Sequence, residues 1–323
     1  MRKIHIALLS FIAICASALV EQSASAAEIN FQLNWRPTAG FAGYYQAQKS
    51  GGYLKHDLKV KFLHGGPKVD PIESVVSGKA QFGLTGAKRL LKARAAGKPV
   101  RAIAAINRRS PIVFISLKKL GIVRPQQFVG HKIRATPDLV PTLRAIMRQV
   151  SVPDNAYEIV SLPSKVDLFE KGDVPIWGAH ISGMALKLQQ RGHDLNIIFP
   201  SDYGLESLSG VIFSTDSYLD ANKQTATDFL AASLTGIQQV IEDTSKAGPL
   251  VKIYNPDTDV AFQNARMESS IPLIHTGEDS IGWMKPESWK NIVAFQKQQG
   301  ELPNGFSAKD IYSLEYLKRI QSR

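Results

Sequence analysis

Short apolar runs alternate with amphipathic segments along most of the chain, from Phe31 to about Phe199. Short apolar runs bounded by turn residues are typical of buried strands, whereas apolar residues that recur every three or four positions are typical of helices. The runs predict strands at Phe31–Leu33, Val60–Leu63, Phe82–Leu84, Val100–Ile106, Ile112–Leu117, Lys132–Ala135, Ile159–Leu162, Val174–Trp177 and Asn196–Phe199.

The segments between these runs begin and end as helices do. Asp70 is followed by Pro71 and Glu73, which predicts an N-cap, a first helical residue and the acidic partner of the cap. Gly78 can end the same helix in the left-handed conformation. After Ser214 the pattern changes to longer helices, predicted at Thr225–Lys246, Asp259–Ser270, Pro286–Gln299 and Ala308–Ile320.

This order of elements predicts an α/β chain with a mostly parallel sheet in each of two lobes and a helical C-terminal tail. No Gly/Ser-rich linker or internal repeat separates the parts, so we expect strands that cross between the lobes to join them. The predicted limits are 28–115 with 212–323 for lobe one and 116–211 for lobe two. Ligands of such sheets bind beyond the carboxyl ends of the strands, where the loops converge.

The first residues form a pattern typical of a secretory signal peptide. Arg2 and Lys3 precede an apolar run from Ile4 to Val20, and Ala24-Ser25-Ala26 is a small-residue cleavage site. No stop-transfer charges follow the run, which disfavours a retained membrane anchor. We therefore expect residues 1–26 to be a cleaved signal peptide and the mature chain to be exported.

The only cysteine of the sequence is Cys15, which lies within this apolar run. Ile14 precedes it, where a lipoprotein signal requires a small residue, so we do not expect a lipid anchor. Removal of the leader leaves a chain without cysteine, which excludes disulfides, thiol nucleophiles and cysteine-ligated metals from the mature protein.

The chain is basic, with a formal net charge of +11 at pH 7. Its basic residues are spread over many predicted helices and do not form one arm, and nucleic acid is a poor partner for an exported protein. We interpret the excess charge as solvated helix faces together with an electrostatic bias toward anions.

The first predicted strand leads into an aromatic-rich corner, "FQLNWRPTAGFAGYYQAQKSGGYL". Its aromatic residues are Trp35, Phe41, Tyr44 and Tyr45. Buried aromatic residues usually pack in a core. This corner follows a strand end, however, where ligands bind in α/β sheets. For Trp35 and one of the two tyrosines, contact with a ligand is therefore as good an interpretation as packing in the core.

Four ordered motifs carry a resemblance to a known family: "LNWRPTAGFAGYYQAQKSGGYL", "HGGPKVDPIESVVSGKAQFGL", "LLKARAAGKPVRAIAAINRRSPIVFISLK" and "GHDLNIIFPSDYG". They resemble the periplasmic solute-binding proteins that capture thiamine pyrimidine precursors, which are related to the fungal pyrimidine-precursor synthases. The match runs from about Ile29 to Tyr218 and is weaker in the helical tail.

The resemblance implies a two-lobed type II periplasmic binding protein whose cleft closes over a flat heteroaromatic ring. Aromatic side chains stack on such a ring. Gly65 and Gly66 follow the second predicted strand, where backbone without a side chain can approach a ligand closely, although an ordinary turn explains the two glycines equally well. The implied ligand-binding residues are Trp35, Tyr44, Tyr45, Gly65 and Gly66 from lobe one, and Thr136, Trp177 and His180 from lobe two.

The chain departs from the family pattern in three ways. Phe41 stands where family members usually have a histidine, and the cysteine-rich motif of the synthases is absent. Family members that serve transport commonly have a glutamate after the tryptophan of the second lobe, where it contacts an amine on the ligand ring. This glutamate is absent here, because the chain reads Trp177-Gly178-Ala179-His180-Ile181-Ser182. The missing histidine and cysteines disfavour an enzyme related to the synthases, which remains the alternative from another class. The missing glutamate makes a ligand-sensing role plausible beside uptake.

Cations stand at predicted strand ends instead. Lys88 and Arg89 follow the third strand, and Arg109 and Ser110 follow the fourth. Guanidinium groups bind carboxylates and phosphates in a fork, so we expect an aromatic anion as ligand, unless these side chains simply point into water. Glu206 is a further candidate, as a partner of the ligand or of a cleft arginine.

The sequence predicts no catalytic residue, no metal site and no cofactor. No H-E-x-x-H, G-x-S-x-G or G-x-x-x-x-G-K-[ST] pattern occurs. The resemblance implies a small-molecule ligand, and a membrane partner that is either the permease of an ABC transporter or the periplasmic domain of a sensor. The sequence leaves uptake and sensing open, and we expect a monomer.

Overall fold

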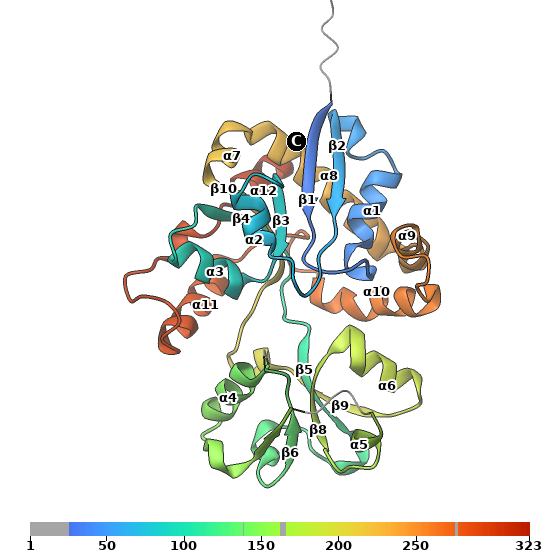
Figure 1. Ribbon diagram of the computed structural model, residues 1–323, viewed down its shortest axis with the longest axis vertical. Helices are drawn as coiled ribbons and strands as arrows, with labels where there is room; N and C mark the ends of the chain where they lie inside the picture. The colour runs from blue at the N-terminus through green and yellow to red at the C-terminus, as the bar shows by residue number, and fades with distance from the viewer. Residues whose placement is uncertain (1–25, 138, 162–165, 275–276) are drawn as a thin grey trace, which may run out of the picture.

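The computed structural model describes residues 26–137, 139–161, 166–274 and 277–323. The predicted signal peptide up to Ser25, with Cys15, lies outside these residues, as does His275. The described chain forms two five-stranded sheets in two lobes, one above the other in Figure 1. Sheet one contains β1 (Ala27–Gln32), β2 (Leu58–Leu63), β3 (Phe82–Thr85), β4 (Val100–Asn107) and β10 (Ser209–Thr215); sheet two contains β5 (Ile112–Leu117), β6 (Lys132–Arg134), β7 (Glu158–Val160), β8 (Ile176–His180) and β9 (Leu195–Ile198).

Each sheet has one strand that runs against the other four. The strand order is β2-β1-β3-β10-β4 in sheet one, where β10 is antiparallel to both neighbours, and β7-β6-β8-β5-β9 in sheet two, where β5 is antiparallel to both. These are the two strands that arrive directly from the other lobe. Because the carboxyl ends of the parallel strands face the other lobe, a chain that enters from there must run in the opposite direction. The prediction of mostly parallel sheets in two lobes is confirmed.

The predicted strands agree with nine of the observed ones to within a few residues, and β5 matches its prediction end to end. β10 was not predicted as a strand. Its sequence, Ser-Gly-Val-Ile-Phe-Ser-Thr, has a very short apolar run, and it is held by pairing with β3 and β4, which lie far away in the sequence.

Two short segments join the lobes, 108–111 and 199–208. The limits of these segments are set by the strands at their ends, because β5 belongs wholly to sheet two and β10 wholly to sheet one. The limits predicted from the sequence fall inside these two strands, a few residues beyond the observed crossings.

Helices cover both faces of each sheet. Lobe one carries α1 (Ala42–Lys49), α2 (Pro71–Val76), α3 (Ala87–Ala95), α7 (Asp216–Ala221), α8 (Lys223–Glu242), α9 (Ala247–Tyr254), α10 (Val260–Ile274), α11 (Pro286–Gln298) and α12 (Glu315–Gln321); lobe two carries α4 (Val140–Gln149), α5 (Val166–Glu170), α6 (Leu186–Gln190) and the short π-helical turn η6 (Ile181–Ala185). The helical tail is therefore confirmed. It is tied to sheet one, since the amide of Ala102 in β4 donates to the Ile311 carbonyl and the amide of Ser313 donates to the Ala102 carbonyl.

The start of α2 follows the predicted pattern at the cap and at the first helical residue, whereas Glu73, the predicted acidic partner of the cap, pairs with a lysine instead. The Asp70 side chain accepts a hydrogen bond from the Ile72 amide at 2.9 Å, and Pro71 is the first helical residue. Gly78 follows the helix with a φ of 78°, the left-handed conformation expected at this position. Strand ends and helix starts thus meet at the edge of sheet one that faces lobe two.

Two helices of lobe one reach lobe two. Phe295 of α11 packs against the apolar cluster of α4 and sheet two, and Arg148 of α4 donates a hydrogen bond to the side chain of Gln299 at the end of α11. On the other flank α10 packs against η6, and the Lys187 ammonium of α6 lies 5.4 Å from the ring centre of Phe262 in α10. Figure 1 shows α11 above α4 and α10 above α6, with the crossing segments between them.

Candidate functional site

A cavity of about 880 Å³ lies between the two sheets and is lined from both lobes. Lobe one contributes the loops after β1, β2 and β3, together with α3 and α11. Lobe two contributes α4, and both crossing segments contribute residues as well. The cavity therefore lies at the carboxyl ends of strands, where the order of elements predicted a ligand.

The aromatic residues of the first corner divide between this cavity and the core. Trp35 lines the cavity, and its side chain is 48% exposed. Phe41, Tyr44 and Tyr45 are buried in the core of lobe one and are not among the lining residues. Of the four aromatic candidates, Trp35 alone is placed where it can stack on a ligand.

The two tyrosines are buried because α1 is covered on more than one side. The Tyr44 ring meets the Phe31 ring edge-on at 5.0 Å, and the Tyr45 ring stacks on Tyr254 of α9 at 4.1 Å. The Tyr45 hydroxyl and His64 Nε2 are hydrogen-bonded at 3.0 Å. Burial raises the pKa of both tyrosines and lowers the pKa of His64. The two rings and the Tyr45 hydroxyl thus make contacts within the core of lobe one, away from the cavity lining.

The two glycines after β2 also have different roles. A Cβ atom on Gly65 would lie 2.5 Å from the Leu33 carbonyl oxygen, so glycine is needed there for the close approach of two strand ends. Gly66 lines the cavity, and a Cβ atom on it would meet open space. Gly65 thus has a structural role, and Gly66 is the one of the two that faces the cavity.

Lys88 and Arg89 both line the cavity, but their charges have different partners. Lys88 donates to the Glu301 carboxylate at 2.9 Å, and Lys92 lies 3.3 Å from the same carboxylate. Burial alone would raise the pKa of Glu301, yet the two lysines outweigh it and hold this pKa below its ordinary value. Arg89 is exposed, and among the described residues it has no ion pair or side-chain hydrogen bond. Its charge is available to a ligand.

α4 brings two more arginines to the cavity from lobe two. Arg144 lies 3.6 Å from the Asp154 carboxylate, and Arg148 donates to Gln299 across the lobes. Glu206 also lines the cavity, on the second crossing segment. Lys88, Arg89, Lys92, Arg144 and Arg148 thus face only two carboxylates, Glu206 and Glu301, among the lining residues. The cavity favours anions electrostatically.

Arg109 does not line the cavity, although Ser110 beside it does. The Arg109 guanidinium lies 3.9 Å above the Phe199 ring and donates to Ser201 at 2.8 Å and to Asp202. All three contacts join the first crossing segment to the second. Arg109 therefore belongs to the connection between the lobes, which its position in the sequence did not reveal.

The lobe-two candidates lie away from this cavity. Trp177 is fully buried beneath the Arg134 guanidinium, which lies 4.8 Å from the centre of its ring, and its Nε1 atom has no hydrogen-bond partner among the described residues. Thr136 follows β6 and accepts hydrogen bonds from the backbone of the next turn. His180 ends β8, and its Nδ1 atom lies 3.1 Å from the Ser182 hydroxyl. Burial, and to a lesser extent the charge of Arg266, lowers the pKa of His180 to about 4.

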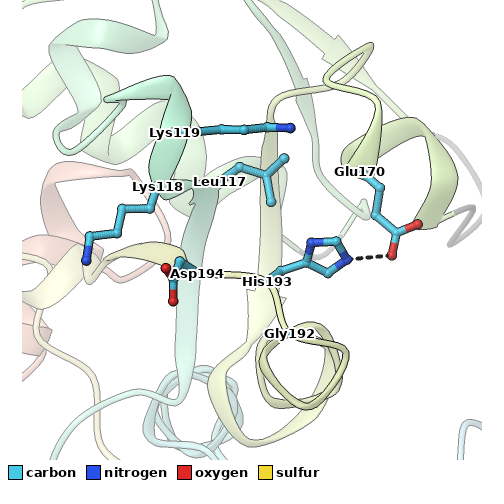
Figure 2. Close-up of a pocket in the computed structure, with 7 residues that line it drawn as sticks. All are labelled: Leu117, Lys118, Lys119, Glu170, Gly192, His193 and Asp194. Atoms are coloured by element: carbon cyan, nitrogen blue, oxygen red, sulfur yellow. Dashed lines mark hydrogen bonds and ion pairs between the residues drawn. The ribbon is translucent and has the colours of Figure 1, made fainter.

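A second, smaller cavity of about 380 Å³ lies at the outer end of lobe two. It is lined by Leu117, Lys118, Lys119, Glu170, Gly192, His193 and Asp194 (Figure 2). Figure 2 shows the hydrogen bond between His193 and Glu170. The His193 Nε2 atom lies 2.9 Å from the Glu170 carboxylate, and the Arg191 guanidinium lies 3.5 Å from the same carboxylate. Its charges largely neutralise one another, and only lobe two contributes to it. We therefore place the candidate ligand site in the larger cavity.

The described residues contain no group of three or more histidine, cysteine or acidic residues arranged to hold a metal ion. Within the same part of the chain, every helix is too short or too polar to cross a membrane.

The sequence did not single out three residues that the structure places at the cavity or between the lobes. Glu301 pairs with the cavity lysines, Arg148 bonds across the lobes, and the charge of Arg266 contributes to the lowered pKa of His180. Each depends on a contact between distant parts of the chain. For Arg266 the sequence offers one weak signal, its position one helical turn after Phe262.

The two sheets, the antiparallel crossing strands and the cavity between the lobes define the fold of the two-lobed type II periplasmic binding proteins. A chain described as the periplasmic sulfonate-binding protein SsuA of a putative sulfonate ABC transporter, from Methylobacillus flagellatus KT, superposes with a TM-score of 0.70. It is 14% identical, and the match covers 92% of this chain and 94% of that one. At this identity the likeness shows the fold.

The chain belongs to the NMT1/THI5-like family, which its sequence matches over residues 38–247, more than half of its length. A formylaminopyrimidine-binding protein of Halalkalibacterium halodurans is 23% identical over 319 residues, covering 94% of each chain. The riboflavin-binding protein RibY of Chloroflexus aurantiacus is 20% identical over 305 residues, covering 90% of this chain and 86% of the relative. The resemblance stated from the sequence motifs is thereby confirmed, and these full-length relatives are binding proteins.

Proposed function

We propose that this protein is a periplasmic solute-binding protein that closes over a small aromatic anion and delivers it to the permease of an ABC transporter. The observation that carries the proposal is the composition of the large cavity. It combines an exposed Trp35 with an excess of cations, among which Arg89 has no partner in the described chain. The indole offers a stacking surface, and the guanidinium offers a fork of donors to a carboxylate, sulfonate or phosphate.

The relatives support an aromatic solute. Two full-length relatives are named for binding a formylaminopyrimidine and riboflavin, both of which contain flat heteroaromatic rings. The uptake role is supported by the ABC transporter named for the sulfonate-binding protein of the same fold. Binding without catalysis also agrees with Phe41, which occupies the usual histidine position and is buried in the core.

Closure would follow from contacts to both lobes. A ligand between Trp35 or Arg89 of lobe one and α4 of lobe two binds the closed arrangement more tightly than the open one, and shifts the balance by that difference in affinity.

The proposal is tested by a thermal-shift screen followed by calorimetric titration. The panel contains aromatic carboxylates, sulfonates and phosphates, together with neutral and cationic aminopyrimidines of similar size. We expect the anions to raise the melting temperature most, by mass action. Arg89→Gln should weaken binding of the best anion by about 1.5–3 kcal/mol, or roughly 10- to 150-fold. Arg191→Gln, at the outer end of lobe two, is the matched control and should bind normally. Preferential binding of a cationic aminopyrimidine would contradict the anion assignment.

A further inference from the structure

α10 presents one face to lobe two, on the flank of the crossing segments away from α11 (Figure 1). It packs against η6, the turn that follows β8. Phe262 and Arg266 lie four residues apart on this helix and therefore on the same face. Phe262 contacts the Lys187 ammonium of lobe two, and Arg266 acts on the charge of His180. Arg266 is thus a cation of lobe one that faces lobe two.

The Arg266 guanidinium has no hydrogen bond or ion pair within the described chain. It is partly buried, and burial lowers its pKa. A charge that is taken out of water without a counter-charge destabilises the protein unless a partner is supplied. Such an uncompensated guanidinium between two lobes is better explained by a ligand than by packing.

The facing segment of lobe two cannot neutralise Arg266. From Ile176 to Gln190, through β8, η6 and α6, the sequence contains no aspartate or glutamate. Its charged or titratable members are His180 and Lys187. On α10 itself, Glu268 follows Arg266 by two residues and is exposed, on a different side of the helix. Neither this segment nor the described part of α10 therefore places a counter-charge beside Arg266.

His180 adds a neutral donor to this site. Its lowered pKa keeps the imidazole uncharged at neutral pH. The Ser182 hydroxyl lies 3.1 Å from Nδ1. When this hydroxyl donates to Nδ1, the ring hydrogen is on Nε2, which can then donate to a ligand. A guanidinium and an imidazole N–H both donate, which is the arrangement that suits an oxyanion.

We propose that Arg266, together with the hydrogen-bonded pair of His180 and Ser182, binds an oxyanion between the two lobes, on the flank away from α11. The chemical class is a carboxylate, phosphate or sulfate, either as a group of the bound solute or as a free inorganic ion. Because Arg266 belongs to lobe one and His180 to lobe two, the oxyanion contacts both lobes and stabilises their closed arrangement. The proposal stands whichever solute fills the large cavity.

The test measures thermal unfolding while sodium sulfate is added at constant ionic strength, with sodium chloride as the exchanged salt. Wild-type protein should melt at a higher temperature as sulfate rises. Arg266→Gln should lose this response, with an apparent sulfate affinity at least about tenfold weaker, the loss that corresponds to a charged hydrogen bond. Arg319→Gln is the matched control, because Arg319 is an exposed arginine of α12 that pairs with Glu315; it should respond as wild type does.

Without sulfate, Arg266→Gln should melt at the same or a higher temperature than wild type, because it removes an uncompensated charge. A lower melting temperature would show that Arg266 stabilises the fold through protein contacts and would overturn the proposal. An unchanged sulfate response in Arg266→Gln would overturn it as well.

A second variant and a second titration complete the test. His180→Gln retains a side-chain donor and should weaken the sulfate response severalfold without abolishing it, which a purely structural role of His180 would not produce. A benzoate titration identifies the source of the oxyanion. If Arg266→Gln loses both benzoate and sulfate, the oxyanion belongs to the solute; if it loses sulfate alone, the site takes a free inorganic ion.

Discussion

The two lobes bury their apolar residues in different ways. Lobe one contains one continuous cluster that runs from β1 to α12 and includes Tyr44, Phe82 and Trp289. Lobe two is divided by its sheet into two smaller clusters, one against α4 and one against α5 and α6. Since apolar burial is the dominant favourable contribution to folding, we infer that lobe one provides the stable base. The groups that respond to a ligand or to pH lie mostly between the lobes.

The largest effect on stability is expected inside the lobe-one cluster. Tyr44→Ala removes a fully buried ring that packs against Phe31 and should lower the free energy of unfolding by about 3–5 kcal/mol. Urea denaturation checks the value. Tyr44→Phe, which keeps the ring, is the control and should cost far less. If Tyr44→Ala instead left stability unchanged and abolished ligand binding, the division between core and cavity would be wrong.

A pH effect is expected at His180, where the lobes meet. Its pKa is about 4 in the folded protein, below the ordinary value of 6.5. Between pH 6.5 and 4 the unfolded chain therefore binds a proton that the folded chain does not, so the free energy of unfolding decreases as the pH falls. The decrease from this residue is roughly 3 kcal/mol, which corresponds to the size of the shift.

The difference in stability between wild type and His180→Asn, measured from pH 7 to 4, isolates this contribution. The variant should lose less stability on acidification than wild type does. His131→Gln, at an exposed position, serves as the control. A difference that does not change with pH would place His180 in a solvated environment.

Trp35 tests the opposite side of the comparison, because it is exposed at the cavity. Trp35→Ala should weaken binding of the aromatic ligand by about 1–3 kcal/mol through the lost stacking and burial, with little change in stability. Trp35→Phe should retain part of the affinity. Calorimetric titration and thermal unfolding together separate the two effects. Equal loss of stability with unchanged affinity would move Trp35 into the core.

The smallest effect is expected at the hydrogen bond between the lobes on the α11 side. Arg148→Ala removes the donor to Gln299 and should shift the balance toward the open form by about 0.5–1.5 kcal/mol, the usual net contribution of one hydrogen bond. Small-angle scattering of the ligand-free protein should show a larger radius of gyration for this variant. Gln149→Ala, at the neighbouring exposed position, should leave the radius unchanged.

Most of the fold could be predicted because its information is local. Apolar runs placed nine strands, and the sequence around Asp70 placed a helix start down to the capping hydrogen bond. β10 escaped prediction because its stability comes from antiparallel pairing with β3 and β4, on strands that are distant in the sequence. A short apolar run gives no sign of such pairing.

The site could be predicted only in part, for a related reason. The sequence indicated that the corner after β1 lies at the ligand edge, but not which aromatic side chains are buried there. Tyr45 is covered by Tyr254, which comes from a helix much later in the chain. In the same way, Arg109 forms an ion pair with Asp202, whereas Arg89 has no ion pair or side-chain hydrogen bond in the described chain. Both outcomes depend on tertiary contacts between distant segments.

The most direct test of the central claim is a crystal structure of the protein with the tightest anion from the binding screen. The account predicts that the aromatic ring stacks on the Trp35 indole, and that the anionic group lies within hydrogen-bonding distance of the Arg89 guanidinium, with α4 closed over the ligand. A ligand bound at the outer cavity of lobe two, or one that leaves Trp35 and Arg89 in solvent, would contradict it.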